Sequence, residues 1–415
     1  MATVSVELHS LRAASFCVTQ SDQEISRANR RPLPWLRQRL LNAGGAVPFS
    51  TYMEWVLHDP VHGAYGSGRL QIGRRGDFVT APSLGDDFAA LLISQIAAWL
   101  EAAGPGPLAL VETGPGEGQL ALQLAEALAR SWPELASRTE LVLIEPNPGM
   151  QRRQRDHLRH SPLVTRWSCF EELAESPLHG LVLAHEVLDA LAVERIQKHA
   201  QRWHRQMVAY QNGELALIPG EPWQHYCNWD LSALGLPPED GRRGEGWCSE
   251  LHTGLEPWLQ SCGSSLASGH LLVIDYALEA FRYYSPQRDS GTLMAYRQQH
   301  ASTDPLLNPG QWDLTAHLCL DTLIQSAQAV GWQLEGQCRQ GEALLALGLA
   351  QRLHDLSHGS GSQLGTLLQR REHLLRLVDP SAFGDFRWIC FAKNPPPSKG
   401  KVEGPMFLRD PQTNQ

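Results

Sequence analysis

The residues best suited to chemistry follow a short apolar segment early in the chain. This segment, residues 108–111 (LALV), is typical of a buried strand, and an acid and three glycines come directly after it: Glu112, Gly114, Gly116 and Gly118. A helix-forming run begins at Leu120. A strand, a glycine turn and a helix N-terminus place bare N–H groups beside a strand end, where nucleotide-like ligands bind in open α/β sheets. The stretch therefore favours a cofactor site over an ordinary tight turn.

The spacing of the glycines distinguishes between cofactors. A dinucleotide site has the pattern GxGxxG, whereas here the third glycine comes one residue early, and Pro115 removes an amide that a pyrophosphate could use. S-adenosylmethionine has no phosphate, and its ammonium and sulfonium suit nearby acids. Glu145, which follows the next apolar run, is expected to accept the ribose hydroxyls. We therefore predict that S-adenosylmethionine is bound by Glu112, Gly114, Gly116, Gly118 and Glu145.

Four apolar runs are each closed by an acid. The runs are residues 108–111, 141–144, 181–184 and 271–274, and the acids are Glu112, Glu145, Glu186 and Asp275. Continuous apolar runs that alternate with helical segments predict parallel strands covered on both faces, in an α/β fold. The four acids would then share the carboxyl edge of one sheet, where ligand crevices form.

The chain divides into four predicted regions. Residues 1–30 form a polar tail, and residues 31–105 an N-terminal helical segment with a glycine-rich loop at 62–82. Residues 106–393 form the main domain, interrupted at about 195–265 by an insertion that covers the crevice, and residues 394–415 form a disordered tail. Asp313 is predicted to cap a helix that continues to Ala327.

Composition limits the classes of partner. A net charge of −9 argues against nucleic acid, and the arginines at 152, 153, 155 and 159 are interpreted as a solvated helix face. Eight cysteines without CxxC or zinc spacing indicate reduced thiols, and Pro60 separates His58 from His62, so no metal is predicted. The most apolar run, 88–100, is too short to span a bilayer. We expect the bacterial cytoplasm, with the mitochondrial matrix as the alternative.

The pattern ExGxGxG followed by an acid after the second strand resembles class I methyltransferases. Five further stretches, in this order, resemble the MidA-type family: GDFVTAP (76–82), HEVLDALAV (185–193), VIDYA (273–277), GTLMAYR (291–297) and PGQWDLTAHL (309–318). That family includes a mitochondrial complex I assembly factor that methylates arginine. Two positions depart from its usual pattern, because His185 stands where asparagine is usual and Ala277 where glycine is usual.

The resemblance implies a Rossmann-like class I methyltransferase sheet and, as substrate, an arginine on a protein partner such as a complex I-type subunit. Carboxylates hold guanidinium groups by paired hydrogen bonds, so Glu186 and Asp189 are the catalytic candidates; three residues apart, they face one way if this turn is helical. His185 is either a base, a hydrogen-bond donor to the substrate or a structural histidine. Asp77 and Thr80, on the glycine-rich loop, either close over the ligands or belong to a tight fold-back.

Two alternatives stay open at this point. One is a methyltransferase that acts on another protein or on a small molecule. The other is an assembly chaperone with a vestigial cofactor site, although an intact ExGxGxG pattern argues against a dead site. The oligomeric state does not follow from the sequence.

Overall fold

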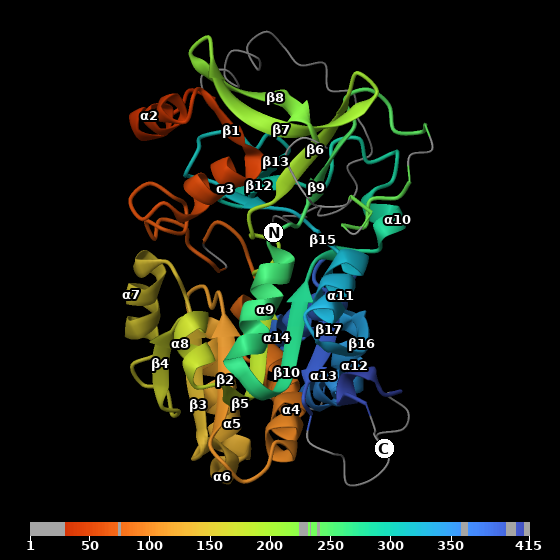
Figure 1. The fold of residues 1–415 in the computed structure, drawn as a ribbon. Helices are drawn as coiled ribbons and strands as arrows, with labels where there is room; N and C mark the ends of the chain where they lie inside the picture. Colours follow the sequence, from red (N-terminus) through yellow and green to blue (C-terminus); the bar gives the residue numbers. More distant parts are fainter. Residues whose placement is uncertain are drawn as a thin grey trace.

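A computed structural model describes residues 30–73, 76–223, 231–232, 234–238, 241–357, 364–395 and 404–410. The predicted N-terminal tail lies outside these residues, apart from Arg30. Figure 1 shows two lobes. The lower lobe contains a large sheet with helices on both sides, and the upper lobe contains the N-terminal helices and an antiparallel sheet.

The lower lobe is built on a mostly parallel sheet. Among the described residues it has seven strands, in the order β16 (Gln333–Arg339), β17 (Arg387–Lys393), β10 (Leu266–Asp275), β5 (Leu178–His185), β2 (Leu108–Thr113), β3 (Thr139–Ile144) and β4 (Thr165–Ser168). Strand β17 is antiparallel to both neighbours, and the other pairs are parallel. The strand order reverses between β2 and β5, so the glycine turn after β2 stands at the topological switch point.

Helices cover both faces of this sheet. One face packs against α4 (Asp87–Ala102), α5 (Gln119–Ser131) and α12 (Gln340–Ala346), and the other against α8 (Phe170–Glu175), α9 (Leu255–Ser265) and α11 (Leu320–Ala329). Successive residues of one strand serve opposite cores, as Leu110 and Val111 do. The predicted α/β, Rossmann-like sheet of parallel strands buried on both faces is confirmed.

The upper lobe joins two parts of the chain that are distant in sequence. Strand β1 (Ala46–Pro48), between α2 (Pro34–Asn42) and α3 (Phe49–His58), pairs antiparallel with β7 (Arg202–Gln211) of the insertion. The same sheet contains β6 (Glu194–His199), β8 (Glu214–Pro222) and β9 (Cys248–Leu251). A second small sheet consists of β12 (Met294–Arg297), β13 (His300–Ser302) and β14 (Asp313–Thr315). The N-terminal segment and the insertion therefore form one lobe with a common core.

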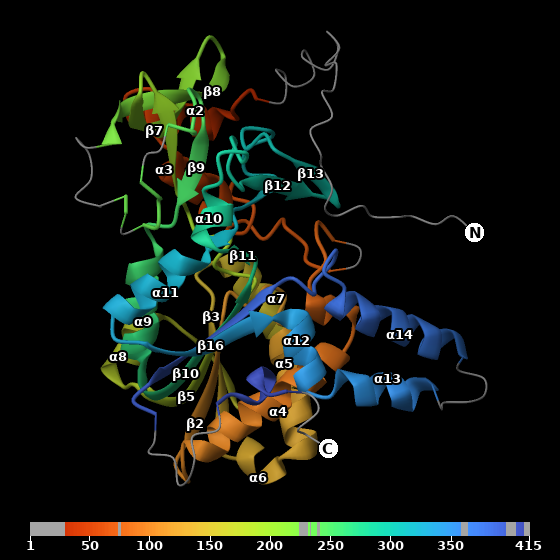
Figure 2. The ribbon, with the colours of Figure 1, turned by 90° about the vertical axis from the view of Figure 1, so that its right-hand side faces the viewer.

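The remaining elements are short or peripheral. They are η1 (Ala81–Leu84), α6 (Pro133–Ala136), α7 (Pro148–His157), β11 (Ala277–Leu278), α10 (Ala280–Tyr283), β15 (Leu318–Cys319), α13 (Leu349–Ser357), α14 (Leu364–Val378) and η3 (Met406–Leu408). Figure 2 shows α13 and α14 extending away from the sheet beside α12. Within the described part of the chain, no helix combines the length and the apolar character that crossing a membrane requires.

Three sequence predictions about these elements are corrected. The insertion was expected to reach residue 265, but α9 packs under the main sheet, so the covering sheet ends with β9. Asp313 does not cap a helix, because it lies in β14 and α11 begins only at Leu320. The C-terminal tail is ordered at 404–410, since Phe407 is 1% exposed and packs between Trp99 and Trp388. Residues 396–403 and 411–415 of that tail lie outside the described residues.

Candidate active site

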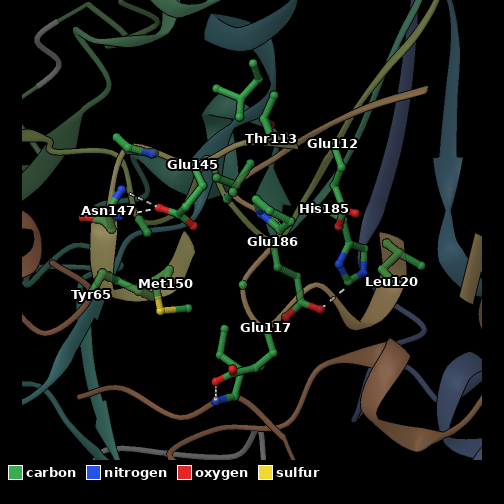
Figure 3. A pocket seen from close by; sticks show the side chains of 18 of the residues that line it. Tyr65, Glu112, Thr113, Glu117, Leu120, Glu145, Asn147, Met150, His185 and Glu186 are labelled. Atoms are coloured by element: carbon green, nitrogen blue, oxygen red, sulfur yellow. Dashed lines mark hydrogen bonds and ion pairs between the residues drawn. The ribbon is translucent and has the colours of Figure 1, made fainter. Parts of the chain in front are cut away.

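A cavity of about 1220 Å³ opens where the two lobes meet. The lower lobe contributes the glycine turn after β2, the ends of β3 and β4, and residues 185–191 after β5. The upper lobe contributes Glu54, His58 and Tyr65, and the loop between them and α4 adds Ile72 and Thr80. Figure 3 shows Glu112 and His185 on one side of this space and Glu145, Asn147 and Met150 on the other. The carboxyl edge of the parallel sheet is therefore the floor of the cavity, as predicted from the strand-closing acids.

The three predicted glycines all adopt left-handed backbone conformations, with φ of 57° at Gly114, 54° at Gly116 and 81° at Gly118. Such angles favour glycine. Gly114 and Gly116 line the cavity. A Cβ on Gly116 would stand 2.7 Å from Ile72 Cδ1, so a loop from outside the sheet packs directly on the turn. Gly118 instead caps α5 and faces Leu158 and Gln154, away from the cavity wall.

Glu112 is 4% exposed, and its Oε2 has no hydrogen-bond partner among the described residues. Burial raises the pKa of Glu112 to about 8. A buried polar atom without a hydrogen-bond partner destabilises the folded state. Because Glu112 lines the cavity, its free oxygen indicates a place where a bound ligand would provide the missing partner.

Glu145 is held by neighbours that the sequence analysis did not single out. Its Oε1 accepts the backbone and side-chain N–H groups of Asn147, each at 2.8 Å, and its Oε2 accepts Gln154 Nε2 at 3.1 Å. Gln154 Nε2 also donates to the Gly116 carbonyl at 2.8 Å, and Trp167 Nε1 donates to Gln154 Oε1 at 2.9 Å. Gln154 thus fixes Glu145 relative to the glycine turn. Its position between Met150 and Leu158, four residues from each, could have revealed it as a polar residue in a buried helix stripe.

His185 and Glu186 lie together at the end of β5. His185 is 8% exposed with its ring 5.2 Å from Phe88, and burial lowers the pKa of His185 to about 3. Burial, with a smaller effect of Asp275, raises the pKa of Glu186 well above its usual value. His185 Nε2 stands 3.3 Å from Glu186 Oε1, without hydrogen-bond alignment (Figure 3). Because the imidazole is neutral near pH 7, this contact is not an ion pair.

Asp189 does not face the cavity with Glu186. The turn after β5 is not helical, because the Asp275 carboxylate accepts the backbone N–H groups of Leu188 at 3.0 Å and Asp189 at 3.3 Å. Asp189 is 8% exposed behind the cavity wall. Burial, together with Asp275, Asp313 and Glu186, raises the pKa of Asp189. The premise that a helical turn aligns the two acids is therefore wrong.

The two predicted loop residues occupy different places. Thr80 lines the cavity, and its hydroxyl stands 2.9 Å from Ser83 Oγ. Asp77 lines a separate cavity of about 520 Å³. Its carboxylate accepts the backbone N–H groups of Gln71 at 2.9 Å and Gln298 at 3.0 Å. Asp77 therefore fastens the loop to the upper lobe instead of reaching the main cavity.

The upper lobe supplies cavity residues that the sequence analysis missed. Glu54 and His58 stand one helical turn apart on α3, and Tyr65 follows in the loop. The His58 and Tyr65 rings stack with centroids 6.0 Å apart, and the Tyr65 hydroxyl bonds the buried carboxyl of Asp313. Burial raises the pKa of Asp313 to about 7. Among the described residues, no group of three or more His, Cys, Asp or Glu side chains could hold a metal ion.

A switch-point cavity with a left-handed glycine turn, and with an acid, Glu145, at the end of the next strand, is typical of nucleoside-binding α/β enzymes. A family profile described as S-adenosyl-L-methionine-dependent methyltransferase matches residues 91–338 of this chain, which is more than half its length. The chain therefore belongs to this family of S-adenosylmethionine-dependent methyltransferases.

Individual relatives agree with this family. A candidate methyl transferase from Burkholderia thailandensis, solved with S-adenosyl-homocysteine bound, superposes with a TM-score of 0.77 at 29% identity, covering 90% of this chain and 94% of that one. The mitochondrial protein arginine methyltransferase NDUFAF7 homolog of Drosophila melanogaster is 27% identical, over 84% of this chain and 82% of its own length. The human protein arginine methyltransferase NDUFAF7 is 26% identical, over 87% and 83%. The resemblance to MidA-type methyltransferases is confirmed, and S-adenosylmethionine is the cofactor.

Proposed function

We propose that this methyltransferase modifies an arginine side chain of a protein partner, and that Glu186 receives the guanidinium. The observation that supports this most is the Glu186 carboxyl group itself. Its side chain is 11% exposed, its Oε1 has no hydrogen-bond partner among the described residues, and it projects into the cavity from a left-handed backbone position with φ of 51°. Strained backbone and a buried carboxyl oxygen without a partner, here at one residue, are features of functional sites.

The charge of the cavity also favours a cationic substrate. Eight carboxylic acids line it, against the single arginine Arg155: Glu54, Asp86, Glu112, Glu117, Glu145, Glu171, Glu172 and Glu186. The volume of about 1220 Å³ exceeds the roughly 300–1,000 Å³ of most small-molecule pockets. It therefore has room for the cofactor and for a long side chain beside it.

The chemistry at Glu186 is binding and proton transfer. The bound cofactor supplies a methyl group on its sulfonium. An ionised Glu186 would hold the guanidinium by paired hydrogen bonds and localise its positive charge away from the attacking nitrogen. The new nitrogen–carbon bond forms as the sulfur–carbon bond breaks, and the nitrogen then loses a proton. Because burial raises the pKa of Glu186, its carboxylate suits the role of acceptor for that proton. The neutral ring of His185, with its Nε2 3.3 Å from Glu186 Oε1, would pack against this carboxyl group.

We assign cofactor binding to the part of the cavity that extends from Glu112 along the glycine turn to Glu145. There, Glu145 would accept the ribose hydroxyls, and Glu112 would face the positive groups of the cofactor. Gly114 and Gly116 allow its close approach, and Thr80 covers it. Gly118 acts by starting α5, and Asn147 and Gln154 by orienting Glu145.

For the partner, we propose a complex I-type subunit, as the resemblance to the MidA-type family implies; the names of the NDUFAF7 relatives describe protein arginine methyltransferases. Those names also state a mitochondrial location, which agrees with the matrix alternative. The solved Burkholderia relative is bacterial, which agrees with the bacterial cytoplasm as our first proposal.

The substrate class can be tested by incubating the purified protein with tritiated S-adenosylmethionine and cell lysate. The labelled residues are then identified by mass spectrometry. We expect label on arginine. Glu186→Gln should lower kcat by about 10²-fold or more while S-adenosyl-homocysteine binds within about twofold of wild type. Glu256→Gln on α9, an exposed position, is the control and should retain full activity. Label only on lysine or on small molecules would contradict the arginine assignment.

A further inference from the structure

Arg153, which the sequence placed on a solvated helix face, instead joins the glycine turn to the loop above it. It projects from α7, and its Nη2 donates to the Leu70 carbonyl at 2.7 Å. Its Nε lies 3.3 Å from Glu117 Oε2 as an ion pair. Glu117 belongs to the glycine turn and lines the cavity. One guanidinium therefore contacts both the glycine turn, to which the proposed function assigns the cofactor, and the loop that lies over this turn.

The loop makes further contacts with the same two elements. The Ile72 amide donates to Glu117 Oε1 at 3.4 Å, and the Ile72 side chain lies against Gly116. At the other end, the loop backbone at Gly68 packs on the first turn of α7, where a Cβ on Gly149 would meet Gly68 N at 2.7 Å. Both oxygens of Glu117 are thus engaged, one by the loop and one by Arg153.

We propose that Arg153 is a positioning residue that fastens residues 70–72 over the glycine turn and so slows the release of the bound cofactor and of its demethylated product. Arg153 is 28% exposed and does not line the cavity, so it acts through Glu117 and Leu70. Removing the Arg153 side chain removes its contacts with Glu117 and Leu70. The backbone packing of Gly68 on Gly149 remains and keeps the loop near the turn.

The dissociation rate of S-adenosyl-homocysteine from the full chain, measured by stopped flow, tests this role without requiring a methyl acceptor. Arg153→Ala should raise the rate about fivefold, the range expected for a partly exposed ion pair and hydrogen bond. Arg153→Lys, which retains the charge, should raise it less. Arg152→Ala is the matched control, because Arg152 is exposed on the same helix, and its rate should equal that of wild type.

Two further measurements separate positioning from a general loss of structure. Raising the salt concentration should speed dissociation in wild type more than in Arg153→Ala, because the variant has no ion pair to screen. In a Glu117→Gln background, Arg153→Ala should have a smaller effect than in wild type. If Arg153→Ala unfolds, Arg153→Gln, which removes the charge and keeps a long side chain, is judged by the same two criteria. An unchanged rate in the folded variant, or equal effects of Arg152→Ala and Arg153→Ala, would overturn the proposal.

Discussion

At the scale of single residues, the backbone angles of the glycine turn and its contact with the loop both disfavour a side chain at Gly116. Gly116 combines a left-handed φ of 54° with contact to the Ile72 side chain. A β-branched side chain at this position would be disfavoured for two reasons. Bulky residues rarely adopt a positive φ, and the side chain would collide with Ile72. The turn and the covering loop therefore lie in direct contact at Gly116.

We expect Gly116→Val to abolish S-adenosyl-homocysteine binding, measured by isothermal titration calorimetry. The change strains the turn and displaces Ile72 from the cavity wall. Gly106→Ala is the control, because a Cβ there meets no atom within 4 Å and its backbone angle is ordinary. Unchanged affinity in folded Gly116→Val would remove this glycine from the cofactor site.

Glu112 predicts a dependence of stability on pH. Burial raises its pKa from 4.5 to about 8, so between these values the folded state keeps a proton that the unfolded chain has lost. The contribution of Glu112 to the free energy of unfolding is therefore present below about pH 4.5 and is lost as the pH rises through about 8. Urea denaturation of the cofactor-free protein should show stability falling from about pH 5 to about pH 8.

Other carboxyl groups with a raised pKa, such as Asp275 and Asp313 with pKa values of about 7, also lower the stability as the pH rises. The comparison with Glu112→Gln therefore isolates this group. The variant should remove up to about 4 kcal/mol of the fall, an upper value for a fully buried acid. If wild type and variant have the same pH profile, Glu112 is ionised in the folded protein.

At the scale of single residues, the sequence predicted the positions of the glycine-turn residues and of the strand-closing acids at the cavity better than that of Asp189. Glycines and strand-closing acids have a fixed spacing from the strands, so Glu112, Gly116 and Glu145 could be placed in one crevice. Asp189 could not be placed, because its direction depends on Asp275, which is distant in sequence. Gln154 lies in a stripe with Met150 and Leu158 that marks it as buried, but neither its hydrogen bonds nor those of Arg153 can be derived from the sequence.

At the scale of elements, the N-terminus of α4 anchors the helical pair α13 and α14 beside the cavity. Asp87 is 8% exposed and accepts hydrogen bonds from Arg370 at 2.6 Å and from Arg352 at 2.9 Å. Burial alone would raise the pKa of Asp87, but the two arginines lower it by more than burial raises it. The pKa of Asp87 therefore lies below its usual value. The neighbouring Asp86 lines the cavity, which brings this anchor next to the site.

Asp87→Asn should lower the free energy of unfolding by about 1–2 kcal/mol, less than for a fully buried pair because Arg352 and Arg370 are 30% and 48% exposed. Hydrogen exchange should quicken in α13 and α14 before the rest of the chain. Asp355→Asn, an exposed position on α13, serves as the comparison and should leave exchange unchanged. Equal exchange in all three proteins would show that α13 and α14 are held by packing alone.

The parallel strands were the most predictable elements, since burial on both faces leaves a continuous apolar signature. The upper lobe was not predictable, because β1 has three residues and pairs with a strand of the insertion. A pairing between such distant segments leaves no local periodicity. Phe407 was missed for the same reason, as one aromatic residue in a polar segment carries no pattern.

At the scale of the whole molecule, the site exists only because the two lobes meet. The lower lobe provides the cofactor end of the cavity, and the upper lobe provides Glu54, His58 and Tyr65. The glycine-rich loop connects them, since Asp77 binds it to the upper lobe while Ile72 and Leu70 bind it to the lower lobe. A ligand at the glycine turn should therefore be sensed in both lobes.

Hydrogen exchange with saturating S-adenosyl-homocysteine should accordingly slow in residues 112–120 of the lower lobe and also in residues 54–58 and 70–73. The protection across the loop arises because a bound ligand favours the fastened arrangement over locally opened states. Gly116→Val is the control, because we expect it not to bind S-adenosyl-homocysteine. It should show no protection at the same ligand concentration, which excludes non-specific effects of the added compound. Protection confined to the lower lobe would mean that the loop and the upper lobe respond only to the methyl acceptor.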